Sequence, residues 1–265
     1  MQRPHTERLA FLQNYPNLIE QRDDLVLEEI TLLNQTGRYT EAKRKLDSHQ
    51  FHPWEGGEGK VPFQYQTARI ELAKLAIADE KYAEAIVLLN ECLQYPHHLG
   101  EGKLYGAQEN DFFYLLGLCY KAMGQEDEAN KCFEQATLGP TEPAAAMYYN
   151  DAKPDKIFYA GLAFRALGDE NKARAYFNRL VDYGKQHLHE KVVMDYFAVS
   201  LPDLQIWDGS LDEANRIHCL YMLALGYAGL GDKEHSDRYL AEAASMNINH
   251  QGIQSFKTLY NVAKF

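Results

Sequence analysis

The stretch Leu116-Gly-Leu-Cys-Tyr-Lys-Ala-Met-Gly-Gln-Glu-Asp-Glu-Ala129 decides the fold of this chain. A mostly apolar segment ends at Gly124, and the next segment opens with acidic residues, which is typical of two helices joined by a tight turn. The second segment continues to Phe133 and Ala136 at helical spacing. Small residues such as Gly117 let two helices approach closely and large ones fill the space to the next pair, so the stretch predicts a packed helical hairpin.

The same order of helix, turn and helix recurs four more times along the chain. The other turns read Thr36-Gly-Arg-Tyr-Thr-Glu-Ala42, Asp79-Glu-Lys-Tyr-Ala-Glu-Ala85, Leu167-Gly-Asp-Glu-Asn-Lys-Ala173 and Leu230-Gly-Asp-Lys-Glu-His-Ser236. This pattern resembles the tetratricopeptide repeat, and the stretch quoted first carries the resemblance best. The fold class that follows is all-α, a tetratricopeptide-like α-solenoid of about five helix pairs.

The spacing of the turns predicts long loops between the repeats. Equivalent turn positions lie at residues 37, 80, 124, 168 and 231, which are 43, 44, 44 and 63 residues apart. A standard repeat has about 34 residues, so each interval carries an insertion after its second helix. The insertions fall at about 51–63, 95–109 and 139–153, and the last interval adds a helix at about 187–199 and a loop at 200–209. Because insertions at one repeat position emerge on one face, we expect a single rim of loops.

We expect one domain over residues 1–265. Residues 1–22 form its N-terminal cap, with a helix near Thr6–Asn14 and a turn at Pro16. Residues 251–265 form a C-terminal capping helix that closes the stack. No low-complexity stretch or obvious linker divides the chain.

Composition excludes several classes of function. The net charge of −11, with interspersed charges, argues against nucleic acid as a partner. No apolar run reaches the roughly 20 residues of a membrane span, and the N-terminus lacks the apolar stretch of a signal peptide, so we expect a cytoplasmic protein and no membrane partner. The four isolated cysteines fit a reducing compartment. The histidine pairs at 97–98 and 187–189 lack a metal-ligand pattern, and no phosphate-binding or nucleophile motif occurs, so we expect no metal and no cofactor.

The insertions are rich in aromatic and acidic residues. A Gly-Glu-Gly-Lys core appears at 57–60 and again at 100–103. Its glutamates, Glu58 and Glu101, either accept hydrogen bonds from a ligand or bind the glycine-rich backbone and shape the loops. The loop aromatics either stack on sugar faces or pin the loops to the solenoid. These aromatics are Trp54, Tyr148, Tyr149 and Trp207.

A second group of candidates lies on the first helix of each pair. The second and fifth positions are Asp111 with Tyr114, Asp155 with Phe158, and His218 with Tyr221. The spacing puts each pair on one helix face, and in tetratricopeptide solenoids these positions face the concave groove. The two aspartates also suit the first turn of a helix, where the helix dipole favours carboxylates.

The whole set of loops resembles one bacterial group of large proteins. These proteins join N-terminal β-sandwich regions similar to galactose mutarotase, sometimes labelled glycoside-hydrolase-like, to a C-terminal tetratricopeptide region. The segments that carry the resemblance are Arg22–Leu25, Phe51–Lys60, Leu99–Lys103, Ala107–Asn110, Tyr148–Asp151, Asp195–Asp203 and Asn249–Gly252. The resemblance implies a carbohydrate context and an N-terminal β-sandwich domain of the parent protein as partner. It supplies no catalytic residues.

The first functional hypothesis is therefore a binding or scaffold module that docks on the β-sandwich domain, with rim loops that contribute to a sugar site. Its candidate ligand-binding residues are Trp54, Glu55, Glu58, Lys60, Glu101, Lys103, Glu109, Asn110, Asp111, Tyr114, Tyr148, Tyr149, Asn150, Asp151, Asp155, Phe158, Asp203, His218 and Tyr221. The alternative is an adaptor that binds a peptide or protein in its concave groove, with Lys121 and Arg165 as the basic residues. A complete enzyme is the least favoured reading, because no nucleophile–base pair stands out among the many carboxylates.

Overall fold

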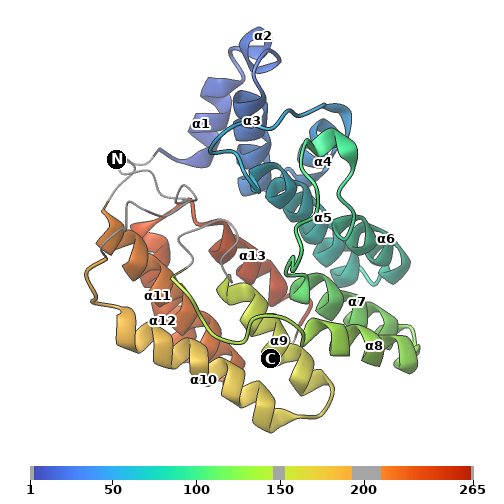
Figure 1. The fold of residues 1–265 in the computed structure, drawn as a ribbon, viewed down its shortest axis with the longest axis vertical. Helices are drawn as coiled ribbons and strands as arrows, with labels where there is room; N and C mark the ends of the chain where they lie inside the picture. The colour runs from blue at the N-terminus through green and yellow to red at the C-terminus, as the bar shows by residue number, and fades with distance from the viewer. Residues whose placement is uncertain (1–2, 146–152, 193–209, 264–265) are drawn as a thin grey trace. The chain divides into compact units, whose positions relative to one another are not determined.

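The computed structural model describes residues 3–145, 153–192 and 210–263. Over these residues every regular element is a helix, which confirms the predicted all-α class (Figure 1). The chain forms two compact units. Unit 1 comprises Met1–Tyr105 with Ile248–Val262, and unit 2 comprises Gly106–Asn247 with Ala263–Phe265. The chain therefore passes from unit 1 to unit 2 and back again, and the assignment of residues 1–265 to one domain stays a prediction.

Unit 1 contains the first two helix pairs, an N-terminal cap and the C-terminal helix. Its helices are α1 (His5–Leu12), α2 (Pro16–Ile19), α3 (Asp23–Gln35), α4 (Tyr39–Ser48), α5 (Lys60–Ala78), α6 (Tyr82–Cys92), the 3-10 helix η1 (His97–Leu99) and α13 (Gln251–Leu259). Apolar residues at helical spacing, such as Ile30 and Leu33 of α3 and Leu46 of α4, form its core together with Phe51.

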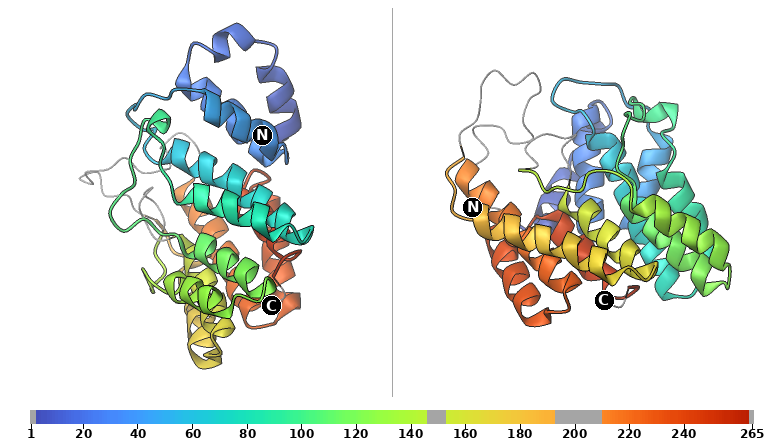
Figure 2. Two further views of the ribbon diagram at one scale, coloured as in Figure 1. Left: turned by 90° about the vertical axis from the view of Figure 1, so that its right-hand side faces the viewer. Right: turned by 60° about the horizontal axis from the view of Figure 1, so that its bottom comes forward.

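Unit 2 contains the remaining three helix pairs. Its helices are α7 (Asn110–Ala122), α8 (Glu126–Ala136), α9 (Pro154–Ala166), α10 (Glu170–His187), α11 (Leu211–Gly229) and α12 (Lys233–Met246). They form three antiparallel hairpins, and the first helices α7, α9 and α11 pack on one another in turn (Figure 2). The expected pairing of small with large residues is confirmed, because a Cβ on Gly117 would lie 2.4 Å from the Phe133 ring, and one on Gly161 would lie 2.5 Å from Phe177.

The five aligned turns share one backbone conformation. The residue at the aligned position has a positive φ, between 74° and 84° for the four glycines and 60° for Glu80. In every turn the next N–H donates to the carbonyl five residues earlier, with nitrogen–oxygen distances of 2.7–2.9 Å. This is the Schellman arrangement that ends a helix, and glycine suits its left-handed residue because it has no Cβ. Among the five aligned positions only Glu80 has a Cβ, which makes the left-handed conformation unfavourable there.

Glu80→Gly is expected to raise the free energy of unfolding of unit 1 by roughly 0.5–1 kcal/mol. A left-handed φ costs a non-glycine residue about 1–2 kcal/mol, and the greater freedom of glycine in the unfolded chain cancels part of that gain. Urea unfolding followed by far-ultraviolet circular dichroism measures the change. The matched control is Glu84→Gly inside α6, which is expected to cost about 1 kcal/mol. Equal losses in the two variants would contradict the expectation.

Three boundaries differ from the sequence-based expectation. The predicted helix at about 187–199 is wrong over its described part, because α10 ends at His187 and residues 188–192 are not helical. The end of α10 and the residues after it instead form hydrogen bonds with α11. Asn215 donates to the His187 carbonyl, and the Val192 N–H donates to Asp212, both at 2.8 Å. Residues 193–199 and the predicted loop at 200–209 lie outside the described residues.

The two ends of the chain also differ from expectation. The predicted turn at Pro16 is the short helix α2, which Pro16 begins because proline suits the first helical position. The C-terminal helix ends at Leu259 rather than at residue 265. It was expected to follow the last helix pair of the stack, but it belongs to unit 1, where it packs on α5 (Figure 1). Periodicity marks this helix in the sequence, whereas its packing partner depends on contacts between distant residues.

Candidate functional site

The two Gly-Glu-Gly-Lys loops lie against each other in unit 1. We call residues 51–60 and 95–105 the loop pair. The Phe51 N–H donates to the His98 carbonyl at 2.8 Å, and the Gly59 N–H donates to the Glu101 carboxylate at 2.7 Å. Gly100 has a φ of +74° and a Cβ there would lie 2.8 Å from the Phe51 oxygen, so only glycine fits. These contacts join the two loops at residues 51, 59 and 98–101.

The Glu101 carboxylate binds a backbone N–H within the loop pair. Burial raises the pKa of its carboxyl group, the Gly59 hydrogen bond opposes that shift, and the nearby Glu58 adds to it. Of the two interpretations left open by the sequence, loop shaping is the one this contact supports for Glu101. Glu58 is exposed, as are Glu55 and Lys60. The repeated core therefore contains one glutamate bound to the backbone and one that faces solvent.

Trp54 ties the first loop to the core of unit 1. Its half-buried ring packs against the buried apolar cluster of unit 1, as Leu12 and Leu25 also do. A Cβ on Gly57 would lie 2.2 Å from the same ring, so the second glycine of the loop is required for the ring to lie there. This position fits the pinning interpretation of the aromatic residue.

Asp23 anchors the start of the loop pair, a role that the sequence did not assign. Its carboxylate accepts hydrogen bonds from the His52 N–H at 2.8 Å, and its oxygens lie 2.7 Å from His49 Nε2 and 3.0 Å from His52 Nδ1. Burial opposes ionisation of Asp23, but the hydrogen bonds from the two histidines outweigh it and lower the pKa. The Arg22–Leu25 segment of the bacterial resemblance contains this residue, which was the available signal.

The outer surface of the loop pair carries apolar side chains that were also missed. Tyr105 is fully exposed and Leu104 is about half exposed, and Phe63 in the first turns of α5 is half exposed too. Lys103 lies beside them and is exposed. Large apolar residues exposed together are typical of a surface that contacts a partner. The signal in the sequence was the Leu-Tyr pair directly after the second Gly-Glu-Gly-Lys core.

The candidates on the first helices of unit 2 pair with one another. Lys156 donates to Asp111, and the Tyr221 hydroxyl donates to Asp155. We call these four residues, with Tyr114 and His218, the polar face. Asp111, Tyr114, Phe158 and Tyr221 are at most 8% exposed. The positions expected to face a concave groove therefore lie mostly between neighbouring first helices.

Burial of Asp155 and a contact of His218 further describe the polar face. Burial raises the pKa of Asp155, whereas the Tyr221 hydrogen bond and the Lys156 charge oppose that shift. His218 Nε2 lies 2.8 Å from the Ala144 carbonyl, so part of the third inserted loop crosses α11 here. Asp111 and Asp155 also lie in the first turns of α7 and α9, where the helix dipole favours them. Both interpretations of the aspartates are thus compatible with their contacts.

The remaining described candidates have structural surroundings. Asn110 donates to the carbonyls of Ala136 and Leu138 at 2.8 and 2.7 Å and joins the start of α7 to the end of α8. Phe158 packs on Phe177, with ring centroids 5.7 Å apart. Glu109 is half-buried at the N-cap of α7.

The basic residues of the adaptor alternative differ from each other. Lys121 is exposed. Arg165 donates to Glu170 at 2.8 Å and to the Gly229 carbonyl at 2.7 Å, and its guanidinium lies 5.0 Å from the centre of the Phe177 ring. A carboxylate-binding role for Arg165 would require it to exchange these contacts.

Five candidates fall outside the described residues, namely Tyr148, Tyr149, Asn150, Asp151 and Asp203. Trp207 lies outside them as well. The loop pair belongs to unit 1 and the polar face to unit 2. The gathering of all insertions on one rim therefore stays a prediction.

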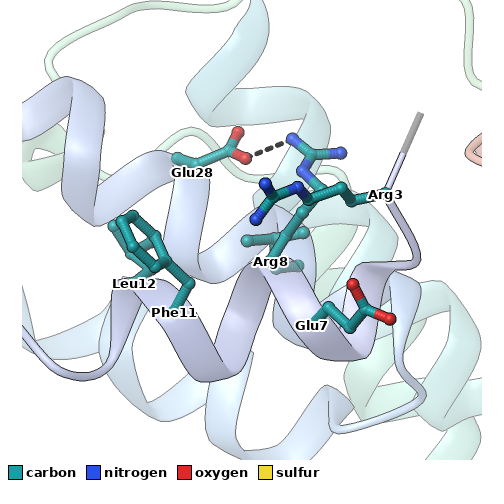
Figure 3. Close-up of a pocket in the computed structure, with 7 residues that line it drawn as sticks. Arg3, Glu7, Arg8, Phe11, Leu12 and Glu28 are labelled. Carbon is teal, nitrogen blue, oxygen red and sulfur yellow. Dashed lines mark hydrogen bonds and ion pairs between the residues drawn. The ribbon is translucent and has the colours of Figure 1, made fainter. Parts of the chain in front are cut away.

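Two small pockets lie in unit 1. The first, of about 180 Å³, is lined by Arg3, Glu7, Arg8, Phe11, Leu12, Glu28 and Leu32, and Arg8 pairs with Glu28 across it (Figure 3). The second, of about 210 Å³, is lined by Ile19, Glu20, Val26, Lys45, Ser48 and His49. Both are smaller than the roughly 300–1,000 Å³ of typical ligand pockets, and neither includes a predicted site residue.

Within residues 3–145, 153–192 and 210–263, no group of three or more His, Cys, Asp or Glu side chains is arranged to hold a metal ion. No helix in these ranges is both long and apolar enough to cross a membrane.

Comparison with known families recognises tetratricopeptide repeats in the chain. Residues 111–138 and residues 157–183 each match a model described as "Tetratricopeptide repeat". These segments correspond to the hairpins α7–α8 and α9–α10. The predicted tetratricopeptide-like solenoid is thereby confirmed at the level of the fold.

Solved structures of low sequence identity align over most of the chain. BtubC (BKLC) from P. vanneervenii is 12% identical and matches 92% of this chain and 88% of its own, with a TM-score of 0.38. YrrB, a TPR protein with an unusual peptide-binding site, is 16% identical and matches 94% and 97%, with a TM-score of 0.32. A Podosopora anserina putative kinesin light chain with nearly identical TPR-like repeats is also 16% identical and matches 83% and 92%, again with a TM-score of 0.32.

Proposed function

We propose that this helical-repeat chain is a module that binds a protein partner through the loop pair of unit 1. The observation that carries the proposal is the combination of two loops joined to each other with exposed apolar and charged side chains. The two loops are joined by the Phe51–His98 and Gly59–Glu101 hydrogen bonds. On the second loop, the Leu104 side chain is about half exposed and the Tyr105 side chain is fully exposed.

A fixed loop surface suits partner binding for an energetic reason. Ordering a mobile loop on binding costs free energy, and a loop whose backbone is already held avoids most of that cost. Aromatic side chains such as Tyr105 contribute large contact areas and few rotatable bonds. The exposed Glu55, Glu58 and Lys60 supply charges that select a complementary partner.

We propose as the partner the β-sandwich domain that the bacterial resemblance implies, with the loop pair at the edge of a sugar site. In this proposal Glu55 and Glu58 accept hydrogen bonds from sugar hydroxyls, and Lys60 and Lys103 neutralise or anchor the acidic groups. Trp54 supports the loop and offers one ring edge. The support is the match of the loop motifs to that group and the exposure of both glutamates.

The docking proposal is tested with Tyr105→Ala. We expect it to weaken binding of a separately produced galactose-mutarotase-like β-sandwich region at least tenfold, about 1.4 kcal/mol, by isothermal titration calorimetry. The control is Val87→Ser, which changes another exposed apolar residue, on α6 of the same unit, and should leave the affinity unchanged. Absence of binding by the wild-type chain, or equal losses in both variants, would contradict the proposal.

The sugar part of the proposal has its own test. Glu55→Gln removes one exposed charge and keeps the shape of the side chain, so the fold should be unaffected. We expect it to lower glycan binding at least fivefold in a protein that joins this chain to the β-sandwich region. If glycan binding is unchanged while Tyr105→Ala still weakens docking, the loop pair binds protein only, and the sugar assignment is wrong.

A further inference from the structure

The C-terminal helix α13 covers a polar face of α5. Gln64, Glu71 and Lys74 lie on one face of α5, since their spacing of seven and three residues follows the helical repeat. Each of them contacts α13: Gln64 bonds to Gln251, and Glu71 and Lys74 bond to Ser255 and Thr258. These contacts join residues more than 180 positions apart in the chain.

The centre of this contact is a buried ion pair completed by α13. Lys74 and Glu71 are only 1% and 2% exposed, and their charged groups lie 2.8 Å apart. The Lys74 ammonium also donates to the Ser255 carbonyl at 2.9 Å and the Ser255 hydroxyl at 2.7 Å. The Ser255 hydroxyl donates to one Glu71 oxygen, and the Thr258 hydroxyl donates to the other at 2.7 Å.

Apolar and polar contacts surround the ion pair. Ile253, Phe256 and Leu259 form the buried side of α13. The segment leading into the helix is held by His5, which lies 3.2 Å from the Ile248 carbonyl, and by Gln35, which donates to the Asn249 carbonyl at 3.3 Å. Helices α1, α3 and α5 therefore together receive α13.

The helix α13 depends on this surface for its structure. It has nine residues, including Gly252 in its first turn. Helices shorter than about 12–15 residues rarely form alone in water, and glycine weakens them further. The chemistry of the receiving surface, rather than the propensity of the segment, therefore selects what binds there.

We propose that the surface of α5 beneath α13 is a helix-binding groove, that α13 is its intramolecular occupant, and that its external partner is an amphipathic helix with the same pattern. The pattern is a pair of hydroxyl residues at i and i+3, with apolar residues at i−2, i+1 and i+4, as Ser255, Thr258, Ile253, Phe256 and Leu259 show. This proposal does not rest on the role proposed for the loop pair.

The ion pair explains why the groove selects hydroxyl residues. A purely apolar helix would bury Lys74 and Glu71 and leave their remaining hydrogen-bonding positions unfilled, which is costly for charged groups. A helix with hydroxyls at i and i+3 fills those positions. The tethered α13 competes with the partner, so the partner's apparent affinity is its intrinsic affinity multiplied by the fraction of grooves that are empty.

The test uses the full chain and a fluorescein-labelled synthetic peptide with the sequence of residues 248–263. Phe256→Asp places a charge on the buried side of α13 and should release it. We expect this variant to bind the peptide at least tenfold more tightly than the wild-type chain does, by fluorescence anisotropy. The matched control is Lys257→Asp, an exposed charge change on the same helix, which should bind like the wild type.

A peptide with alanine at the positions of Ser255 and Thr258 tests the selectivity. We expect it to bind the Phe256→Asp variant at least tenfold more weakly than the parent peptide. Equal binding of the two peptides, or no binding of either, would overturn the proposal. A readout without a destabilising variant is hydrogen exchange: millimolar peptide added to the wild-type chain should expose the amides of 251–259 and leave those of α5 protected.

The alternative occupant is the α13 of a second copy. Wild-type chain that forms dimers with rising concentration, and loses them in Phe256→Asp, would assign the groove to exchange between copies and overturn the assignment to a partner helix. Monomeric wild-type chain at the same concentrations supports the partner assignment.

Discussion

Lys74→Met is expected to lower the free energy of unfolding of unit 1 by about 3–5 kcal/mol, because it leaves the Glu71 carboxylate buried without its cation. Glu71 is 2% exposed, so water does not replace the ammonium. The hydroxyls of Ser255 and Thr258 would remain, but they also contact Lys74 and would have to reorient. Hydrogen exchange of the α5 amides, together with urea unfolding, measures the loss within unit 1.

The chain offers a matched control for this prediction. Glu128 and Lys131 form a pair with the same i, i+3 spacing and a 2.7 Å contact, but both side chains are more than half exposed. Lys131→Met is therefore expected to cost less than about 1 kcal/mol. The double variant Lys74→Met with Glu71→Leu should recover most of the loss, since no unpaired charge remains. Similar losses in the two single lysine variants would show that burial of the ion pair is unimportant.

Acidification is expected to release α13 from unit 1 between about pH 6.5 and pH 4. The His250 side chain caps α13 by accepting the Ile253 N–H at 3.2 Å, which requires an unprotonated nitrogen. Burial lowers the pKa of His250 to about 4, and a backbone hydrogen bond opposes that shift. The unfolded segment therefore takes up a proton near pH 6.5 that the docked one does not, so stability is present above that pH and is lost as the pH falls toward 4.

The size of this effect follows from the shift. A full shift corresponds to about 3 kcal/mol, and partial exposure of the His250 ring reduces the expectation to roughly 2 kcal/mol. His5, which contacts the same segment, adds in the same direction, because burial lowers its pKa too. Urea midpoints measured at a series of pH values give the slope of stability against pH.

His250→Asn separates this group from the carboxylates that titrate in the same range. Asparagine is a good N-cap residue and does not titrate, so the variant keeps the cap and loses the dependence. We expect its stability to be less sensitive to pH than that of the wild type between pH 4 and 6.5. Parallel curves for the two proteins would rule out His250 as the titrating group.

The helical hairpins could be predicted from the sequence because their signals are local. Gly37, Gly124, Gly168 and Gly231 mark helix ends within a few residues of the turn that needs them, and the φ values of 74–84° show why glycine stands there. Glu80 was placed in the same alignment without a glycine, and its φ of 60° shows that the repeat pattern outweighs the local preference. Five copies of one pattern make the fold class robust to one such exception.

The candidate residues could be predicted only as types. The repeated Gly-Glu-Gly-Lys core in the sequence indicates a repeated loop, but the two glutamates differ in role, since Glu101 bonds to Gly59 and Glu58 is exposed. Asp155 and Tyr221 were both selected for groove positions, and their hydrogen bond to each other follows from the packing of α9 on α11. Spacing within a helix predicts the face of a side chain, whereas the neighbouring helix decides whether that face is open.

Helix periodicity and turn chemistry act over a few residues, so the all-α class, the repeated hairpins, their turns and the loops inserted between them can be predicted from the sequence. That α13 belongs to unit 1 and completes the ion pair of Glu71 and Lys74 becomes visible only in the folded chain. That contact joins residues more than 180 positions apart, and its hydrogen bonds are satisfied only when Ser255 and Thr258 reach a buried pair of charges. Local sequence patterns do not predict such a contact, because it depends on which surfaces the folded helices leave uncovered.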